Sequence, residues 1–333
     1  MAGRSLPVYE GGRVSSLRKD GSRSFVYPAD VTGPFTRARR VVFYLLIGLW
    51  AALPWVHVGG HPAGFLDIDH RRFYLFGQTF NAQDVWLVFF LLTGAGFALV
   101  YATAILGRAF CGWMCPQTVF LEGVFRPLER ALLGPRSARM RLKDAPFSLN
   151  KAVRLGALHA AYAVAAFAVA HIVLSYFVSL PAVLRMVRAA PAAHPEAFAW
   201  ALSLTAATYL NFAWFREQVC VVICPYGRMQ SVLLDADSLV VGYDERRGEP
   251  RGKARDANAG DCVDCNRCVV VCPTGIDIRN GIQLDCIACT QCIDACDEVM
   301  VKLGRPKGLV RYDSQAGLQG KPRRVVRPRL FVY

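Results

Sequence analysis

The sequence predicts an α-helical polytopic membrane protein with about four transmembrane helices and a small cysteine-rich α+β domain. Two observations support this fold class. Of the 333 residues, 54% are hydrophobic and only 19% are charged, whereas soluble domains carry about 25% charged residues. Eight of the twelve cysteines are grouped near the C-terminal end of the chain. The high hydrophobic content also excludes a disordered chain.

Four apolar stretches are long enough to cross a bilayer, which takes about 20 mostly apolar residues. They cover residues 41–58, 85–106, 155–180 and 197–215. Each is expected to be a helix, because a helix satisfies its backbone hydrogen bonds within one segment. The first stretch is too long for the apolar core of a cleavable signal peptide, so we predict that it is retained.

Basic residues predict the orientation of these spans, because cytoplasmic loops are enriched in Arg and Lys. Residues 1–40 and 126–154 hold eight each, whereas residues 59–84 and 181–196 hold two each. We therefore expect the N-terminus and everything after residue 215 to lie in the cytoplasm. The basic loops account for the net charge of +14, and without an aromatic-rich binding module we expect contact with membrane lipid and none with nucleic acid.

All twelve cysteines lie on this predicted cytoplasmic side, where thiols stay reduced, so metal or redox chemistry is favoured over disulfides. The last eight form two runs of C-x2-C-x2-C-x3-C spacing: Cys262, Cys265, Cys268 and Cys272, then Cys286, Cys289, Cys292 and Cys296. This is the ligand spacing of ferredoxins with two [4Fe–4S] clusters, in which the fourth cysteine of each run binds the other cluster. Structural zinc sites, the alternative, normally lack the third cysteine step.

We therefore predict a bacterial-type 2[4Fe–4S] ferredoxin α+β domain over residues 255–305. One cluster would be held by Cys262, Cys265, Cys268 and Cys296, and the other by Cys272, Cys286, Cys289 and Cys292. The core of this region, residues 261–303, is too small to be held by apolar packing alone. The clusters are therefore expected to be structural as well as redox-active.

Two further cysteine pairs share the spacing Cys-x3-Cys-Pro and follow the second and fourth spans: Cys111 and Cys115, then Cys220 and Cys224. If a helix continues through each pair, both sulfurs lie on one side and the proline then ends the helix. Four soft sulfurs brought together would suit Cu(I), another iron–sulfur centre or a reversible dithiol. The alternative is four buried thiols that act as small hydrophobic groups.

Histidines offer further candidates. The first outer loop carries residues that could capture a metal ion, although loop histidines are more often solvated: His57, His61, His70, Asp67 and Asp69. His159 and His171 lie in the third span, too far apart along a helix to bind one ion together. A hydrogen bond to a neighbouring helix is the favoured role, and binding of haem, quinone or copper is the alternative.

Five stretches carry a family resemblance: Cys111-Gly-Trp-Met-Cys-Pro-Gln-Thr-Val, Arg216-Glu-Gln-Val-Cys to Cys224-Pro-Tyr-Gly-Arg, Tyr243-Asp to Arg247-Gly-Glu-Pro-Arg251-Gly, Cys272-Pro-Thr-Gly-Ile-Asp-Ile-Arg-Asn-Gly281, and Cys296-Asp-Glu-Val-Met300. Together they resemble the CcoG/FixG/RdxA family of membrane polyferredoxins, accessory proteins of cbb3-type cytochrome c oxidase. The resemblance extends from about residue 65 to residue 311. Quinol-dehydrogenase subunits of the NapH type share the spans and cysteine motifs but not the 247–252 stretch.

The resemblance implies an oxidoreductase of the cupric reductase kind in the bacterial inner (cytoplasmic) membrane. It would reduce Cu(II) to Cu(I) for the copper centre of the oxidase, with that oxidase or its copper-assembly factors as partner and an unidentified electron donor. The implied catalytic group is Cys111, Cys115, Cys220 and Cys224, with copper bound at these thiols. A NapH-like quinol-linked subunit and a metal-delivery scaffold without turnover remain alternatives.

The predicted organisation has five parts. They are a basic N-terminal segment (1–40), a transmembrane domain (41–224), a linker (225–254), the ferredoxin domain (255–305) and a basic tail (306–333). Members of the family that this chain resembles typically continue into a fifth transmembrane helix and an immunoglobulin-like extracytoplasmic domain. Residues 327–333 are expected to be the first turn of that helix, in either a truncated sequence or a short member of the family.

Overall fold

The computed structural model describes residues 25–331 except 69 and 257, and it is mostly helical. The longer helices are α1 (Pro34–Ala52), α2 (Val85–Leu106), α7 (Leu149–Leu174), α9 (Pro195–Leu210) and α13 (Gln291–Lys302). The shorter helices are α3 (Ala109–Trp113), α4 (Pro116–Phe120), α5 (Arg126–Leu133), α6 (Arg136–Asp144), α8 (Leu180–Arg188), α10 (Pro225–Leu233), α11 (Glu245–Gly248), α12 (Arg267–Val270) and α14 (Gln315–Leu318). Single π or 3-10 turns are η1 (Ala82–Asp84), η2 (Leu121–Phe125), η3 (Pro191–Ala193), η4 (Asn211–Phe215), η5 (Val219–Ile223), η6 (Ile278–Asn280) and η7 (Pro328–Phe331).

Two helical stretches are long and apolar enough to cross a membrane, Ala82–Leu106 and Leu149–Leu174. The helix α2 has the predicted bounds of the second span. Its apolar side chains are largely exposed, with Phe89 and Leu92 each more than 60% accessible, as expected for a helix that faces lipid. The second stretch, α7, packs along α9.

Two predicted spans have bounds that differ from those of the observed helices. The first span was expected to run to residue 58, but α1 ends at Ala52 because Pro54 has no N–H to continue the helix. The third span was expected over 155–180, whereas α7 begins after its cap Ser148 and ends at Leu174. The next helix, α8, has a proline in its first turn. Over the fourth span, α9 and η4 follow each other without a break from residue 195 to 215.

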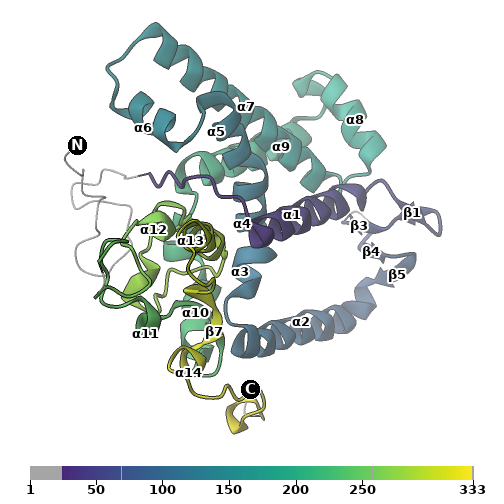
Figure 1. Cartoon of the computed structure of the whole chain (residues 1–333). Coiled ribbons are helices and arrows are strands. Elements are labelled where there is room, and N and C mark those ends of the chain that lie inside the picture. The colour runs from purple at the N-terminus through teal and green to yellow at the C-terminus, as the bar shows by residue number, and fades with distance from the viewer. Residues whose placement is uncertain (1–24, 69, 257, 332–333) are drawn as a thin grey trace.

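The loops between the long helices separate into two ends of the molecule (Figure 1). At one end lie α8 and five short strands: β1 (His57–Val58), β2 (His61–Pro62), β3 (Gly64–Asp67), β4 (Arg72–Leu75) and β5 (Gln78–Asn81). These strands form one antiparallel pair and one three-stranded antiparallel sheet, in the order β3-β4-β5. The cysteine-rich part, with α12 and α13, lies at the opposite end.

We call residues 239–314 the ferredoxin part. Its sheet pairs β6 (Leu239–Tyr243) antiparallel with β7 (Val310–Ser314), so that Tyr243 faces Val310 and Leu239 faces Ser314. Both strands lie outside the predicted 255–305 region. They contribute Val241 and Val310 to a core that also contains α12, α13 and most of the eight cysteines. The packed unit is therefore longer than the cysteine spacing alone suggests.

Candidate functional site

Four of the predicted cluster ligands line one cavity of about 360 Å³ in the ferredoxin part. Cys262 and Cys265 come from the loop before α12, Cys268 lies on α12, and Cys296 lies on α13. Burial and the neighbouring thiols raise the pKa of Cys296 to about 12. The fold thus brings together the four cysteines that the sequence predicts for one cluster.

The other four predicted ligands, Cys272, Cys286, Cys289 and Cys292, line a second cavity of about 340 Å³. Cys268 borders both cavities, so they are adjacent. Burial raises the pKa of Cys289 to about 12, and such thiols stay protonated at neutral pH unless a metal displaces the proton. Two adjacent cavities, each lined by the four thiols predicted for one cluster, fit the donor set of two [4Fe–4S] clusters. The assignment of ligands to clusters remains a prediction.

The backbone turns that point these thiols inward are the same in both runs. The residues on either side of the middle cysteine are left-handed: Asp264 and Asn266 around Cys265, with φ of 50° and 57°, and Ala288 and Thr290, with φ of 51° and 63°. Asp and Asn tolerate this conformation, whereas Ala and Thr pay about 1–2 kcal/mol for it. The second run therefore holds a strained turn that the surrounding packing must maintain.

The two membrane-side pairs also share one local geometry, which differs from the predicted one. Cys111 lies on α3 and Cys220 lies on η5, but in each pair the second cysteine is extended and precedes the next helix. Pro116 and Pro225 occupy the first turn of α4 and α10. The expectation of one helix through each pair, ended by proline, is therefore wrong. Proline begins the next helix, because its fixed φ suits that position.

The four membrane-side thiols are close enough to act on one another. Burial raises the pKa of Cys111 to about 11 and that of Cys220 to about 12, and the thiols of Cys115 and Cys224 contribute to both increases. The Cys111 thiol also donates to Oε1 of Gln230 at 3.4 Å. Within the described residues, no three Cys, His, Asp or Glu side chains are placed to hold a single metal ion. A copper ion bound by three of these thiols would require them to move closer together.

The first pair packs directly on the second predicted cluster loop. A Cβ atom added to Gly112 would lie 2.5 Å from the carbonyl oxygen of Ile287 and 2.8 Å from that of Ala288. Only a glycine at this position allows the two backbones to approach so closely. The peptide after Cys111 therefore touches the loop that carries Cys286 and Cys289.

Hydrogen bonds of Arg108 and Trp113 also join the first membrane-side pair to the second predicted cluster loop. The Arg108 guanidinium donates to the carbonyl oxygens of Leu284 and Cys286, and to that of Gly227 at 2.6 Å. Trp113 Nε1 donates to the Tyr312 hydroxyl at 3.3 Å, and that hydroxyl donates to Ala288 O at 2.9 Å. Arg108 thus connects the cluster loop with both membrane-side pairs.

The histidines do not form a common site. In the outer loop His61 stacks on Tyr74 with ring centroids 4.1 Å apart, and His70 Nδ1 lies 2.9 Å from Asp67; Asp69 lies outside the described residues. The predicted helix-to-helix hydrogen bond is present for His159, whose Nδ1 lies 2.8 Å from the Tyr209 hydroxyl. His171 instead bonds to Phe167 O on its own helix.

Sequence reasoning missed the part played by residues 25–33. This segment crosses the ferredoxin part, where Ala29 N donates to Val270 O at 2.9 Å and Val31 packs against Val271 and Ala295. Gly112 and Arg108 were also missed, because their roles depend on which backbone lies opposite. The only signal in the sequence is that Gly112 directly follows Cys111 and that Arg108 precedes it by three residues.

Two parts of the chain match families of iron–sulfur proteins. Residues 87–135 match a 4Fe-4S binding domain family and residues 215–315 match a 4Fe-4S dicluster domain family. The first match includes Cys111 and Cys115, and the second includes the other ten cysteines. No solved structure gives a significant match.

Three curated relatives cover most of the chain. It is 43% identical over 301 residues to nitrogen fixation protein FixG of Rhizobium meliloti, which is 87% of this chain and 57% of that protein. It is 36% identical to protein RdxA, over 325 residues, and to protein RdxB, over 330 residues, both of Cereibacter sphaeroides. Each of these matches covers 93% of this chain and 69% of the relative.

Proposed function

Because this chain belongs to the FixG/RdxA family of iron–sulfur electron-transfer proteins, we propose that it reduces Cu(II) to Cu(I) during the assembly of a cbb3-type cytochrome c oxidase. The oxidase or its copper-assembly factors would be the partner, and a reductant on the cytoplasmic side would supply the electrons. One electron converts Cu(II) to Cu(I), and soft sulfur ligands stabilise the product.

The eight ferredoxin cysteines would hold two [4Fe–4S] clusters, with Cys262, Cys265, Cys268 and Cys296 at one and Cys272, Cys286, Cys289 and Cys292 at the other. Bound clusters supply one-electron redox chemistry. The chain itself contributes two cavities lined by thiols, and left-handed turns that aim three sulfurs of each run inward.

Copper would be handled by the four membrane-side thiols, Cys111, Cys115, Cys220 and Cys224. The observation that carries this proposal is the contact of Gly112 with the 286–289 loop, since it leaves no intervening layer between the two cysteine groups. Electron transfer favours such short separations. The neighbouring thiols help to raise the pKa values of Cys111 and Cys220, which supports their acting as one group.

We further propose that α1, α2, α7 and α9 with η4 are four transmembrane spans in a bacterial inner membrane. The separation of the two loop ends supports this topology, because the loops poor in basic residues lie opposite the ferredoxin part (Figure 1). The N-terminal segment and the ferredoxin part would then share the cytoplasmic side. The linker 225–254 and the tail 306–333 would flank the ferredoxin domain there.

The test uses anaerobically purified full-length protein, reduced with dithionite and freed of reductant before Cu(II) is added. Production of Cu(I) is followed with a Cu(I)-specific chromogenic chelator. We expect the double variant Cys111→Ser/Cys115→Ser to lose at least about tenfold in rate while it retains iron, sulfide and the visible spectrum. The control Met114→Ser removes an exposed sulfur from the same motif and should keep the wild-type rate.

Three outcomes would contradict the proposal. Copper reduction by the double variant at the wild-type rate would remove these thiols from the route. If the oxidation state of the clusters responds to an added quinol and not to Cu(II), the NapH-like quinol-linked subunit is favoured. If neither reagent changes the spectrum, a metal-delivery scaffold is the better interpretation.

A further inference from the structure

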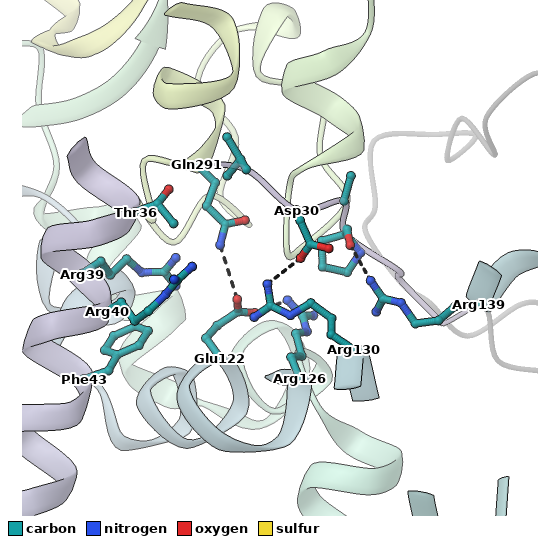
Figure 2. Close-up of a pocket in the computed structure, with 13 residues that line it drawn as sticks. Asp30, Thr36, Arg39, Arg40, Phe43, Glu122, Arg126, Arg130, Arg139 and Gln291 are labelled. Carbon is teal, nitrogen blue, oxygen red and sulfur yellow. Dashed lines mark hydrogen bonds and ion pairs between the residues drawn. The ribbon is translucent and has the colours of Figure 1, made fainter. Parts of the chain in front are cut away.

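A strongly basic cavity, partly open to solvent, lies where the membrane helices meet the ferredoxin part (Figure 2). It is bordered by residues 28–31, the first turns of α1, the helix that runs through η2 into α5, and the start of α13. Its lining includes five arginines and two acidic residues: Arg39, Arg40, Arg126, Arg130, Arg139, Asp30 and Glu122. Among these lining residues three positive charges have no counterpart.

The two acidic residues of the cavity are already engaged. Glu122 pairs with Arg126, and Asp30 lies 2.5 Å from Nη1 of Arg130. Burial, the largest influence on Glu122, would raise its pKa, but the charges of Arg126 and Arg39 outweigh it and hold the pKa below its usual value. Just outside the cavity, Glu217 lies 3.5 Å from Nη2 of Arg126 and Glu129 lies 3.6 Å from Nη1 of Arg139. Arg39 and Arg40 are therefore the two lining cations without a carboxylate within 4 Å among the described residues.

Several guanidinium nitrogens in the wall are buried and lack a hydrogen-bond acceptor among the described residues. They are Nη2 of Arg39, Nε of Arg126 and Nε of Arg139, on side chains that are at most 3% exposed. Arg39 donates from Nε to Gly112 O at 2.7 Å. In one orientation the Gln291 amide donates to Glu122, and in the flipped orientation its oxygen accepts from Nη1 of Arg39. Neither orientation gives Nη2 of Arg39 an acceptor.

Leaving buried charged donors without an acceptor is costly, so an anionic ligand is expected here. Arg40 lies at the cavity rim, is exposed, and has no carboxylate partner within the described ranges 25–68, 70–256 and 258–331. A phosphate group suits this wall better than a carboxylate, because its oxygens accept from several guanidinium forks at once.

We propose that this arginine cavity binds a phosphate group, and that the phosphate belongs to the headgroup of an anionic phospholipid. The apolar face of α1 starts directly after Arg40, where Val41, Leu45 and Leu49 are 58–67% exposed. Acyl chains can lie along that face while the headgroup enters the cavity. Basic pockets at the cytoplasmic ends of transmembrane helices bind lipid headgroups in this way.

The bound phosphate would connect two parts of the molecule. Arg39 extends from the cavity to the backbone beside Cys111, and Gln291 lies between Thr290 and Cys292 on the second predicted cluster loop. A single lipid headgroup would therefore bind α1 and the ferredoxin part together. This role is separate from copper reduction, so either proposal can fail while the other stands.

The test compares two sources of phosphate with matched variants of the full-length protein. Retention of phosphatidylglycerol, relative to phosphatidylcholine, is measured by native mass spectrometry, and inorganic phosphate is titrated by ³¹P NMR. Arg40→Gln and Arg130→Gln should each weaken phosphatidylglycerol retention about tenfold. Arg37→Gln makes the same charge change on α1 outside the cavity and should alter retention less than about twofold.

The outcomes separate the sources. Retained phosphatidylglycerol that depends on Arg40 and Arg130 supports the lipid headgroup, and saturable inorganic phosphate with the same dependence supports the cavity as a site for free phosphate. Equal effects of Arg37→Gln and Arg40→Gln, or no binding of either probe, would overturn the proposal. The visible spectrum of each variant shows whether it is folded, and the exposed Arg40 is the position least expected to disturb folding.

Discussion

At the residue scale, Gly112 sets how closely the membrane-side cysteines approach the ferredoxin part. A methyl group at this position would meet two backbone carbonyl oxygens, which cannot rotate away as a side chain could. We therefore expect Gly112→Ala to destabilise the protein by about 1–3 kcal/mol and to slow copper reduction. Both effects can be measured on anaerobic protein, by urea unfolding followed through the visible absorbance and by the chelator assay.

The matched control for this substitution is Gly156→Ala in the middle of α7. No atom lies within 4 Å of the added Cβ there, and alanine favours a helix by up to about 1 kcal/mol over glycine. This variant should be neutral or more stable, with an unchanged rate. Equal losses in the two variants would show that the close approach at Gly112 is unimportant.

The residues of the candidate site differ in how far the sequence could predict them. The cysteine spacing predicts both groups of four in the ferredoxin part, because three sulfurs of each run come from one local turn. The left-handed Ala288 and Thr290 could not be predicted, since neither residue type favours that conformation. Arg39 and Arg108 act through backbone carbonyls far away in the sequence, and no local pattern indicates such partners.

At the scale of helices, hydropathy located the spans better than their ends. The second span was predicted with its observed bounds, but α1 ends at Ala52 because of Pro54, and α7 begins at its Ser148 cap. Ends depend on single hydrogen bonds, whereas the presence of a span depends on the sum over about 20 residues. The same reasoning could not foresee the strands β1 to β5, which are very short.

The start of α1 is capped by a residue from another helix. Gly33 precedes α1 and has no side chain to cap it, but Asp294 of α13 accepts from Thr36 N at 2.7 Å and from Thr36 Oγ1 at 2.6 Å. We expect Asp294→Ala to cost about 1–2 kcal/mol, because it removes both the cap and a favourable charge at the helix N-terminus. Thermal unfolding in detergent, monitored by visible absorbance, measures this cost.

A control for the Asp294 prediction lies on the same helix. Glu298 also carries a negative charge, but it is partly exposed and pairs with Lys302 at 2.6 Å on the surface. Surface pairs contribute about 0.3–0.5 kcal/mol, so Glu298→Ala should have a much smaller effect than Asp294→Ala. A similar loss in both variants would mean that removal of charge from α13, and not loss of the cap, is responsible.

The ion pair between Asp244, which follows β6, and Arg311 on β7 should make the stability of the protein depend on pH. Burial, the largest influence, acts to raise the pKa of Asp244, but hydrogen bonding and the charge of Arg311, 2.6 Å away, outweigh it and lower the pKa below 3.8. A lowered folded-state pKa stabilises the protein above pH 3.8 and loses this contribution as the pH falls through the folded value. Asp244→Asn should therefore cost about 1–2 kcal/mol between pH 5 and 8 and less below about pH 3.5.

Urea unfolding of wild type and Asp244→Asn, followed by far-ultraviolet circular dichroism at several pH values, tests this dependence. The quantity of interest is the difference between the two proteins, since acid damage to iron–sulfur centres affects both alike. If the difference in unfolding free energy between the two proteins grows as the pH falls, the ionised Asp244–Arg311 pair does not stabilise the protein.

At the scale of the whole molecule, the sequence predicted two kinds of structure, apolar helices and a cysteine-rich domain, but not how they join. The junction consists of residues 25–33, the Asp294 cap, the Gly112 contact and the arginine cavity (Figure 2). Each connects residues that are 150 or more positions apart in the chain or depends on backbone groups. Hydropathy and spacing are local properties, so they contain little information on such contacts.

Removal of iron should unfold the ferredoxin part locally and leave the membrane helices packed. The core of the ferredoxin part combines a few aliphatic side chains with buried cysteines, and buried thiols without metal contribute much less than a filled cluster site. Chelation of iron from the full-length protein should therefore expose residues 255–305 to proteases. Residues 25–33 should become cleavable as well, because Val31 packs in a cluster with Val271, Ala295 and Cys292 of the ferredoxin part. The helix pair α7 and α9 shares no core with these residues and should stay protected, which mass spectrometry of the fragments would show. Unchanged protection of 255–305 after complete iron loss would show that the ferredoxin part is held by its side chains alone.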